Sequence, residues 1–97
     1  MPFNNAVKNA FSEAGILATA PRASGVYGIF NANEWIYIGE AGDMEARLFD
    51  HLRGVSDQST RIWERNPTGF ICEACPAQSR VSRENSLVAE LYPSANL

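Results

Sequence analysis

Two short apolar runs with a polar insert between them constrain the fold of this chain more than any other feature. The runs cover residues 25–30 and 35–38, and the insert covers residues 31–34. Aromatic and β-branched residues favour strands and asparagine tolerates turn conformations, so the stretch predicts a β-hairpin. Because strand side chains alternate, we expect Trp35 and Tyr37 to share one face of the second strand.

A helix is predicted directly after the hairpin. Gly39 interrupts the strand pattern, and it needs no side chain where the backbone turns sharply or approaches a substrate. Asp43 is a suitable N-cap for a helix over residues 44–53. On that helix Arg47 and His51 fall on the same stripe as the apolar residues, so a basic pair should face inward with them.

The remaining elements complete an α+β domain. We expect a first helix over 4–14, a short helical turn over 61–65, a third strand over 70–75, and a last helix from Ser79 or Ser82 to about 91. Three antiparallel strands flanked by helices, in the order α-β-β-α-β-α, would form one domain of 97 residues.

Composition favours a soluble protein. No apolar run approaches the ~18–20 residues that a membrane-spanning helix needs, and the N-terminus lacks the pattern of a signal peptide. An intracellular, cytoplasmic location is therefore expected, with no membrane partner. The net charge of −3 argues against broad affinity for nucleic acid, yet seven of the eight basic residues are arginine, which suits phosphate oxygens.

Cys72 and Cys75 form a lone C-x-x-C pair. A structural zinc needs four ligands, and the only further cysteine or histidine is His51, so we do not expect zinc. A redox pair would sit at the start of a helix, whereas this pair lies in a predicted strand. Two buried or half-buried thiols are the simpler interpretation.

Glu84 is the most informative acidic residue. Leu87, Val88 and Leu91 follow it at helical spacing, which places the carboxylate on an apolar stripe. A carboxylate there needs a partner, either an arginine in a salt bridge or a hard divalent cation.

Four further residues have both a structural and a catalytic interpretation. Arg47 could pair with a nearby carboxylate or clamp a phosphate, and His51 could be a satisfied polar group or relay a proton. Tyr27 and Tyr37 could simply pack against each other across the strands. Catalysis by a phenol, whose ordinary pKa is about 10, would require a nearby cation.

Five pieces of this sequence, in order, resemble the GIY-YIG nuclease family over about residues 24–96. Val26 replaces the isoleucine of the name-giving motif, and Asp43 stands where asparagine is often found, but neither change removes a chemical group that the mechanism needs. The pieces are Gly25-Val26-Tyr27, Tyr37-Ile38-Gly39, Arg47 with His51, Glu84-Asn85-Ser86-Leu87-Val88, and Pro93 with Asn96.

The resemblance implies an endonuclease that hydrolyses phosphodiester bonds, with DNA as the substrate and one Mg²⁺ or Mn²⁺ ion as cofactor. Glu84 would hold the ion, and Arg47 with His51 would stabilise the charge on the phosphate. Tyr27 would activate the attacking water, and Tyr37 would support the phosphate.

Substrate binding is expected from Gly39, Arg53, Arg83 and Asn96. The two arginines belong to a larger group that could follow a nucleic-acid backbone, although each alone could be an ordinary surface charge. By the resemblance, Asn96 would brace the site through hydrogen bonds.

Two other classes of function remain open at this point. The chain could be a nucleic-acid-binding module that keeps the scaffold without turnover, which its acidic total charge favours. It could also be a protein-interaction domain.

Overall fold

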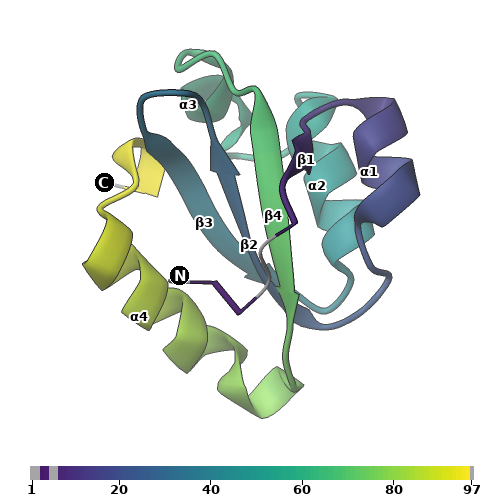
Figure 1. Cartoon of the computed structure of the whole chain (residues 1–97), viewed down its shortest axis with the longest axis vertical. Helices are drawn as coiled ribbons and strands as arrows, with labels where there is room; N and C mark the ends of the chain where they lie inside the picture. The colour runs from purple at the N-terminus through teal and green to yellow at the C-terminus, as the bar shows by residue number, and fades with distance from the viewer. Residues whose placement is uncertain (1–2, 5–6, 97) are drawn as a thin grey trace.

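A four-stranded antiparallel sheet organises the part of the chain that the computed structural model describes, residues 3–4 and 7–96. Its strands lie in the order β1-β4-β2-β3. Helices α1 and α2 cover one face of the sheet, and α4 covers the other (Figure 1). The elements are β1 (Asn9–Ala10), α1 (Glu13–Thr19), β2 (Gly25–Phe30), β3 (Trp35–Ala41), α2 (Met44–Leu52), α3 (Ser59–Trp63), β4 (Gly69–Ala74), η1 (Ala77–Ser79), α4 (Arg80–Leu91) and η2 (Ser94–Asn96).

The α+β class is confirmed and the three predicted strands are present, but the sheet has a fourth strand, so the predicted strand number and element order are wrong. A fourth strand, β1, pairs Asn9 with Phe70 of β4, where the sequence pattern had predicted a helix over 4–14. The helix instead begins at Glu13, because the Ser12 hydroxyl caps it by accepting from the Gly15 N–H at 3.1 Å. Residues 5 and 6 of the expected helix lie outside the described part of the chain.

The predicted hairpin is present, with a β-bulge that changes its faces. The pairing shifts between Ile29 and Phe30, which lie opposite Tyr37 and Trp35 respectively and leave Ile36 as the extra residue. One extra residue reverses the alternation of side chains beyond it. Trp35 and Tyr37 therefore lie on opposite faces, and the expectation that they share one was wrong.

Each face of the sheet has its own apolar core. Met44 and Leu48 of α2 and Ile16 of α1 are fully buried against one face, and Leu87 of α4 is fully buried against the other. Cys72 is buried in the first core, whereas Cys75 packs against the second, so the C-x-x-C pair is divided between the faces. Burial raises the pKa of the Cys72 thiol to about 12.

The two longest helices begin where the sequence indicates. The Asp43 carboxylate caps α2 by accepting from the Ala46 N–H at 3.1 Å. Helix α4 begins at Arg80 and ends at Leu91, followed by Tyr92 in the left-handed conformation. No helix in the described ranges has the length and apolar character required to cross a membrane.

Candidate active site

Gly39 allows a buried tyrosine to reach the edge of the sheet. Tyr27 lies on β2 directly opposite Gly39 of β3, which is an edge strand. A Cβ added at Gly39 would lie 2.6 Å from Cζ of Tyr27 and 2.9 Å from Cε2 of Tyr37. The two tyrosine rings thus occupy the space that any side chain at position 39 would need.

The hydroxyl of Tyr27 meets the chain's only histidine. Its oxygen lies 2.6 Å from Nε2 of His51, on the inward stripe of α2, and both residues are at most 1% exposed. The Tyr37 ring lies edge-on to the imidazole at 5.2 Å and 6.3 Å from the Tyr27 ring. The structure therefore brings the two phenols and the imidazole into one cluster.

Burial keeps these groups in their neutral forms. It raises the pKa of Tyr27 well above its ordinary value, with a further rise from Tyr37, and the nearby Arg47 opposes this effect. Burial and the charge of Arg47 lower the pKa of His51 to about 4. At neutral pH the pair is consequently a phenol and an uncharged imidazole.

Arg47 lies at the solvent side of this cluster. Its Nη2 donates to Oε1 of Gln58 at 3.0 Å, and its Nη1 lies 3.8 Å from the Asp50 carboxylate. It is also near enough to Tyr27 to lower the pKa of that phenol, against the larger effect of burial. About a third of its side chain is exposed, so the guanidinium can contact a bound anion at the edge of the cluster.

Glu84 approaches the same edge of the sheet from α4. Burial and the negative charge of Glu40 raise its pKa, and a hydrogen bond from the Glu40 backbone opposes this rise. Its charge also raises the pKa of Tyr37, where burial has the larger effect, and that of Tyr27. Glu84 is thus near enough to both phenols to influence their ionisation, although it comes from the other face of the sheet.

The acidic pair fits a single hard cation. Two neighbouring carboxylates that disfavour each other's charge are stabilised by a divalent ion, and Mg²⁺ commonly takes one or two carboxylates and keeps several waters. Glu40 already forms an ion pair with Arg80 at 2.7 Å, so Glu84 is the principal candidate ligand. Among the described residues no group of three acidic, histidine or cysteine side chains converges, which excludes an all-protein cage from that part of the chain.

Asn96 supports the edge strand between Tyr37 and Gly39. Its amide donates to the carbonyl of Ile38 and its Oδ1 accepts from the Ile38 N–H, both at 2.8 Å. This side chain supplies the hydrogen bonds that a further strand would make with the outer edge of β3.

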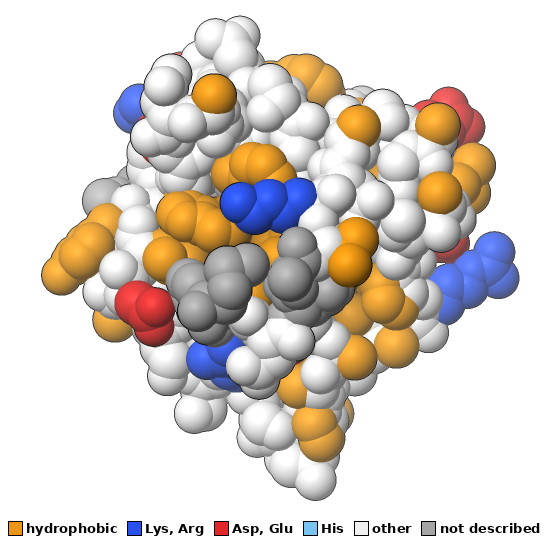
Figure 2. All heavy atoms as spheres, in the orientation of Figure 1, with side chains coloured by type: hydrophobic (Ala, Val, Ile, Leu, Met, Phe, Trp, Pro, Cys, Tyr) orange, Lys and Arg blue, Asp and Glu red, His pale blue; other side chains and the backbone are white. Residues whose placement is uncertain are grey.

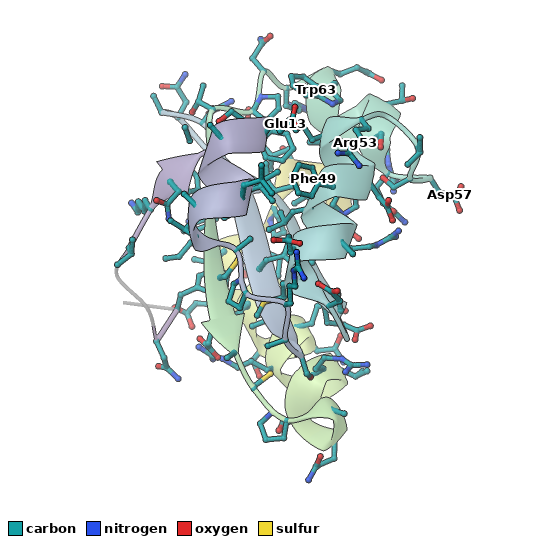
Figure 3. All side chains as sticks on the ribbon, turned by 90° about the vertical axis from the view of Figure 1, so that its right-hand side faces the viewer. Glu13, Phe49, Arg53, Asp57 and Trp63 are labelled. Carbon is teal, nitrogen blue, oxygen red and sulfur yellow. The ribbon has the colours of Figure 1, made fainter. Side chains whose placement is uncertain are left out.

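Two predicted substrate-binding arginines lie elsewhere. Arg53 is stacked on the Phe49 ring at 4.4 Å, on the side of α2 that faces α1 (Figure 3). Arg83 forms an ion pair with Glu73 of β4 at 2.7 Å. The structure does not bring either of them together with Arg47.

Several neighbours of the cluster were not among the predicted site residues. Arg61 of α3, which belongs to the larger group of arginines considered as contacts to a nucleic-acid backbone, is near enough to Tyr37 for its charge to lower the pKa of that phenol against the larger effect of burial. Ser56 contacts the imidazole directly, and Ser59 contacts the Ser56 hydroxyl. Two serines three residues apart are typical of a turn stabilised by side-chain hydrogen bonds, and this spacing could have drawn attention to them.

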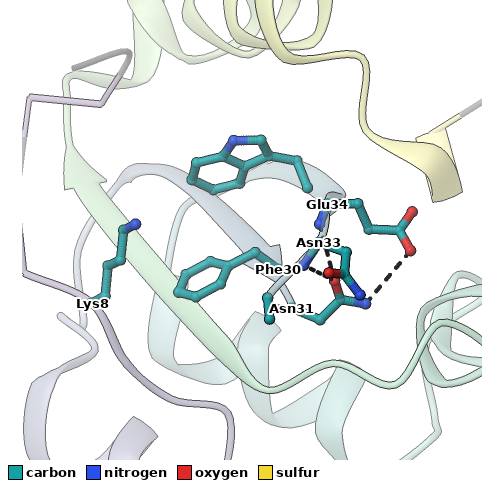
Figure 4. A pocket seen from close by; sticks show the side chains of 7 residues that line it. Lys8, Phe30, Asn31, Asn33 and Glu34 are labelled. Atoms are coloured by element: carbon teal, nitrogen blue, oxygen red, sulfur yellow. Dashed lines mark hydrogen bonds between the residues drawn. The ribbon is translucent and has the colours of Figure 1, made fainter.

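An open pocket of about 240 Å³ lies at the turn of the hairpin, away from these residues (Figure 4). Phe30, Trp35 and the turn 31–34 line it together with Lys8, whose Nζ lies 5.3 Å from the centre of the Phe30 ring. None of the clustered tyrosine, histidine, arginine or glutamate side chains lines this pocket. In the view of Figure 2 the basic side chains stand singly among apolar and uncharged ones, so this face offers no continuous basic surface.

A protein-family model matches most of the chain. The model of the GIY-YIG catalytic domain matches residues 23–96. The chain belongs to the GIY-YIG family. A comparison with curated proteins gives no match.

Solved structures with the same fold also carry the GIY-YIG name. One is the N-terminal endonuclease domain of UvrC from Thermotoga maritima bound to magnesium, its catalytic divalent cation. It is 26% identical, with a TM-score of 0.72, and the match covers 89% of this chain and 99% of the UvrC domain. Two point mutants of that domain match at 26% identity with TM-scores of 0.72 and 0.68, each covering 89% of this chain and 98% of the domain. GIY-YIG membership thus rests on both sequence and fold.

Proposed function

We propose that this GIY-YIG domain is a metal-dependent endonuclease that hydrolyses phosphodiester bonds in DNA. The observation that carries the proposal is the convergence of Tyr27, Tyr37, His51 and Arg47 on the same sheet edge that Glu84 approaches. The magnesium found in the similar UvrC domain supports the choice of cofactor. The family and the arginine-rich basic residues support nucleic acid as the substrate.

Tyr27 and His51 are proposed to activate the attacking water. The water gives a proton to the Tyr27 oxygen as the Tyr27 proton passes to Nε2 of His51, over the 2.6 Å that separates these atoms. The raised pKa of Tyr27 makes this transfer necessary, because a buried phenol does not ionise without a partner that takes its proton. General-base catalysis of this kind contributes ~10²–10⁴-fold to a rate.

Arg47 is proposed to hold the scissile phosphate in line with that water. A fixed cation at hydrogen-bonding distance from the reacting oxygens stabilises the charge that grows in the transition state. The bond to the 3′ oxygen breaks as the water oxygen binds phosphorus. A divalent ion at Glu84, when bound, would polarise the phosphate and stabilise the leaving oxygen.

Gly39 and Asn96 are proposed to position the catalytic side chains without contacting the substrate themselves. Gly39 makes room for the phenols, and Asn96 fixes the strand that carries Tyr37. Arg61, rather than Arg53 or Arg83, is proposed as a further phosphate contact, because its charge reaches Tyr37.

The test is nicking of supercoiled plasmid by the purified chain, with Mg²⁺ and with excess chelator. We expect cleavage that requires the metal and falls at least ~100-fold in Glu84→Gln and in Arg47→Ala, since each removes a group that contacts the reacting phosphate or its ion. Glu90→Gln, an exposed change on the same helix as Glu84, is the matched control and should cleave normally. Metal-independent binding of DNA without cleavage would refute the enzyme and favour a binding module.

A further inference from the structure

A line of hydroxyl groups continues from His51 away from the reacting tyrosine. Nδ1 of His51 lies 2.6 Å from Oγ of Ser56, and that oxygen lies 2.6 Å from Oγ of Ser59. Ser59 is 3% exposed and lies at the first turn of α3. Neither serine touches the edge where the phosphate would lie, so the catalytic proposal leaves these contacts unexplained.

The direction of these hydrogen bonds can be worked out from the Ser59 end. Ser59 Oγ lies 3.3 Å from the carbonyl of Asp50, which can only accept, and we take its single proton to be given to that carbonyl rather than to Ser56. Ser59 Oγ also accepts from the backbone N–H of Ser56 at 3.1 Å. With Ser59 donating to Asp50, the Ser56 hydroxyl donates to Ser59, and its own oxygen accepts a proton from Nδ1 of His51.

The contact between Tyr27 and His51 also places the imidazole proton on Nδ1. Within the described residues the nitrogen Nε2 of His51 is the acceptor that lies within reach of the Tyr27 hydroxyl proton, at 2.6 Å from the phenol oxygen. If Nε2 carried the imidazole proton instead, the Tyr27 O–H would have no acceptor among the described protein groups and would depend on solvent. A buried donor without a partner costs ~1–3 kcal/mol. Both ends therefore favour the proton on Nδ1 and a lone pair on Nε2.

The geometry points to Ser56 and Ser59 as positioning residues that fix the tautomer of His51, so that Nε2 is always ready to take the Tyr27 proton. The effect of this tautomer on catalysis rests on the function proposed above, whereas the tautomer itself does not depend on that function. After proton transfer the imidazolium still donates from Nδ1 to Ser56, so the same pair orients both protonation states.

The groups around the imidazole are consistent with this role. Tyr27 and Tyr37 of the sheet face it, Arg47 lies one turn earlier on α2, and Trp63 of α3 donates its indole N–H to the His51 carbonyl at 3.1 Å. No carboxylate appears among the groups that shift its ionisation or contact its ring in the described part of the chain. The two serines thus take the place that a carboxylate often has behind a catalytic histidine.

The test is long-range ¹⁵N NMR of the imidazole in the whole chain. Because His51 is the chain's only histidine, its two ring nitrogens are assigned without ambiguity. We expect the proton on Nδ1 at pH 7 in the wild type. In Ser59→Ala the Ser56 hydroxyl is released to donate to Nδ1, which should move a measurable fraction of His51 to the Nε2–H tautomer. Ser56→Ala, which removes the contact altogether, should also mix the tautomers. It provides a second variant if loss of the buried Ser59 hydroxyl prevents folding.

Thr60→Ala is the matched control, an exposed hydroxyl on the same helix that should leave the tautomer unchanged. The nicking rate should fall in Ser59→Ala and Ser56→Ala in proportion to the fraction of His51 that NMR finds in the Nε2–H tautomer, with little change in DNA binding. An Nε2–H tautomer in the wild type, or unchanged ring-nitrogen shifts in both serine variants, would overturn the inference. Absence of nicking by the wild type would instead refute the proposed function, and the tautomer would still be decided by NMR.

Discussion

Substitution of alanine for Gly39 is the most discriminating change that this structure suggests. The added Cβ would overlap the Tyr27 hydroxyl, lie 2.6 Å from its Cζ, and lie 2.9 Å from Cε2 of Tyr37. Real Cβ atoms do not make such contacts, so the Tyr27 ring must move off the edge strand and away from His51. Overpacking of this kind costs ~1–3 kcal/mol. Separation of the buried hydrogen bond to His51 adds ~1 kcal/mol.

Gly42→Ala is the matched control. Its added Cβ would meet nothing nearer than Nη1 of Arg80, at 3.8 Å, and its backbone is not in the left-handed region. Urea unfolding of the two variants should therefore show a loss of ~2–4 kcal/mol for Gly39→Ala and a change within ~0.5 kcal/mol for Gly42→Ala. The His51 ring-nitrogen signals should shift only in Gly39→Ala. Equal stability of the two variants, together with unchanged imidazole signals, would refute the packing of Tyr27 over position 39.

Three further predictions follow from other contacts. The lowered pKa of His51 means that, as the pH falls, the unfolded chain binds a proton at this residue before the folded chain does. The free energy of unfolding should therefore fall by ~3 kcal/mol as the pH drops from about 6.5 to about 4. His51→Gln should remove that part of the pH dependence in urea unfolding. Asn96→Ala should lower the free energy of unfolding by ~1–3 kcal/mol and speed hydrogen exchange of the Ile38 amide, because two hydrogen bonds to that residue are lost. Unchanged exchange would contradict the support that Asn96 gives to β3. Arg61→Ala should weaken DNA binding and nicking severalfold while Arg53→Ala changes them little, and the reverse order would contradict the placement of the two arginines.

The hairpin and the two long helices could be predicted from local pattern. Strand-forming residues on either side of 31–34, the cap at Asp43 and the inward stripe of α2 each have a local physical cause, and the structure has the predicted elements there. The N-terminal region could not be predicted in this way. Its short strand exists because Asn9 pairs with β4, some sixty residues later, and helical spacing over 4–14 contains no trace of that partner.

The site shows the same division between local and distant causes. Arg47 and His51 share a helix face, so their proximity follows from spacing alone. The position of Tyr27 against His51 depends on the empty space at Gly39, which is visible only once β2 and β3 are in register. The bulge at Ile36 is also invisible in the alternation pattern, and for that reason the face of Trp35 was predicted wrongly.

Contacts with distant parts of the chain explain why the surface arginines were the least predictable residues. Arg83 and Arg53 are ordinary candidates for phosphate contacts in the sequence, yet one is paired with Glu73 and the other is stacked on Phe49. Such pairings depend on which elements meet in three dimensions. A count of basic residues therefore overestimates those available to a nucleic acid.

The central claim is that Glu84 brings a metal ion to the sheet edge where the phenols and Arg47 meet. Paramagnetic broadening of backbone amide signals by Mn²⁺, titrated into the ¹⁵N-labelled chain, tests this claim most directly. The account predicts broadening centred on residues 39–40 and 84, and its loss in Glu84→Gln. Broadening centred on another part of the molecule, or equally strong in Glu84→Gln, would contradict it.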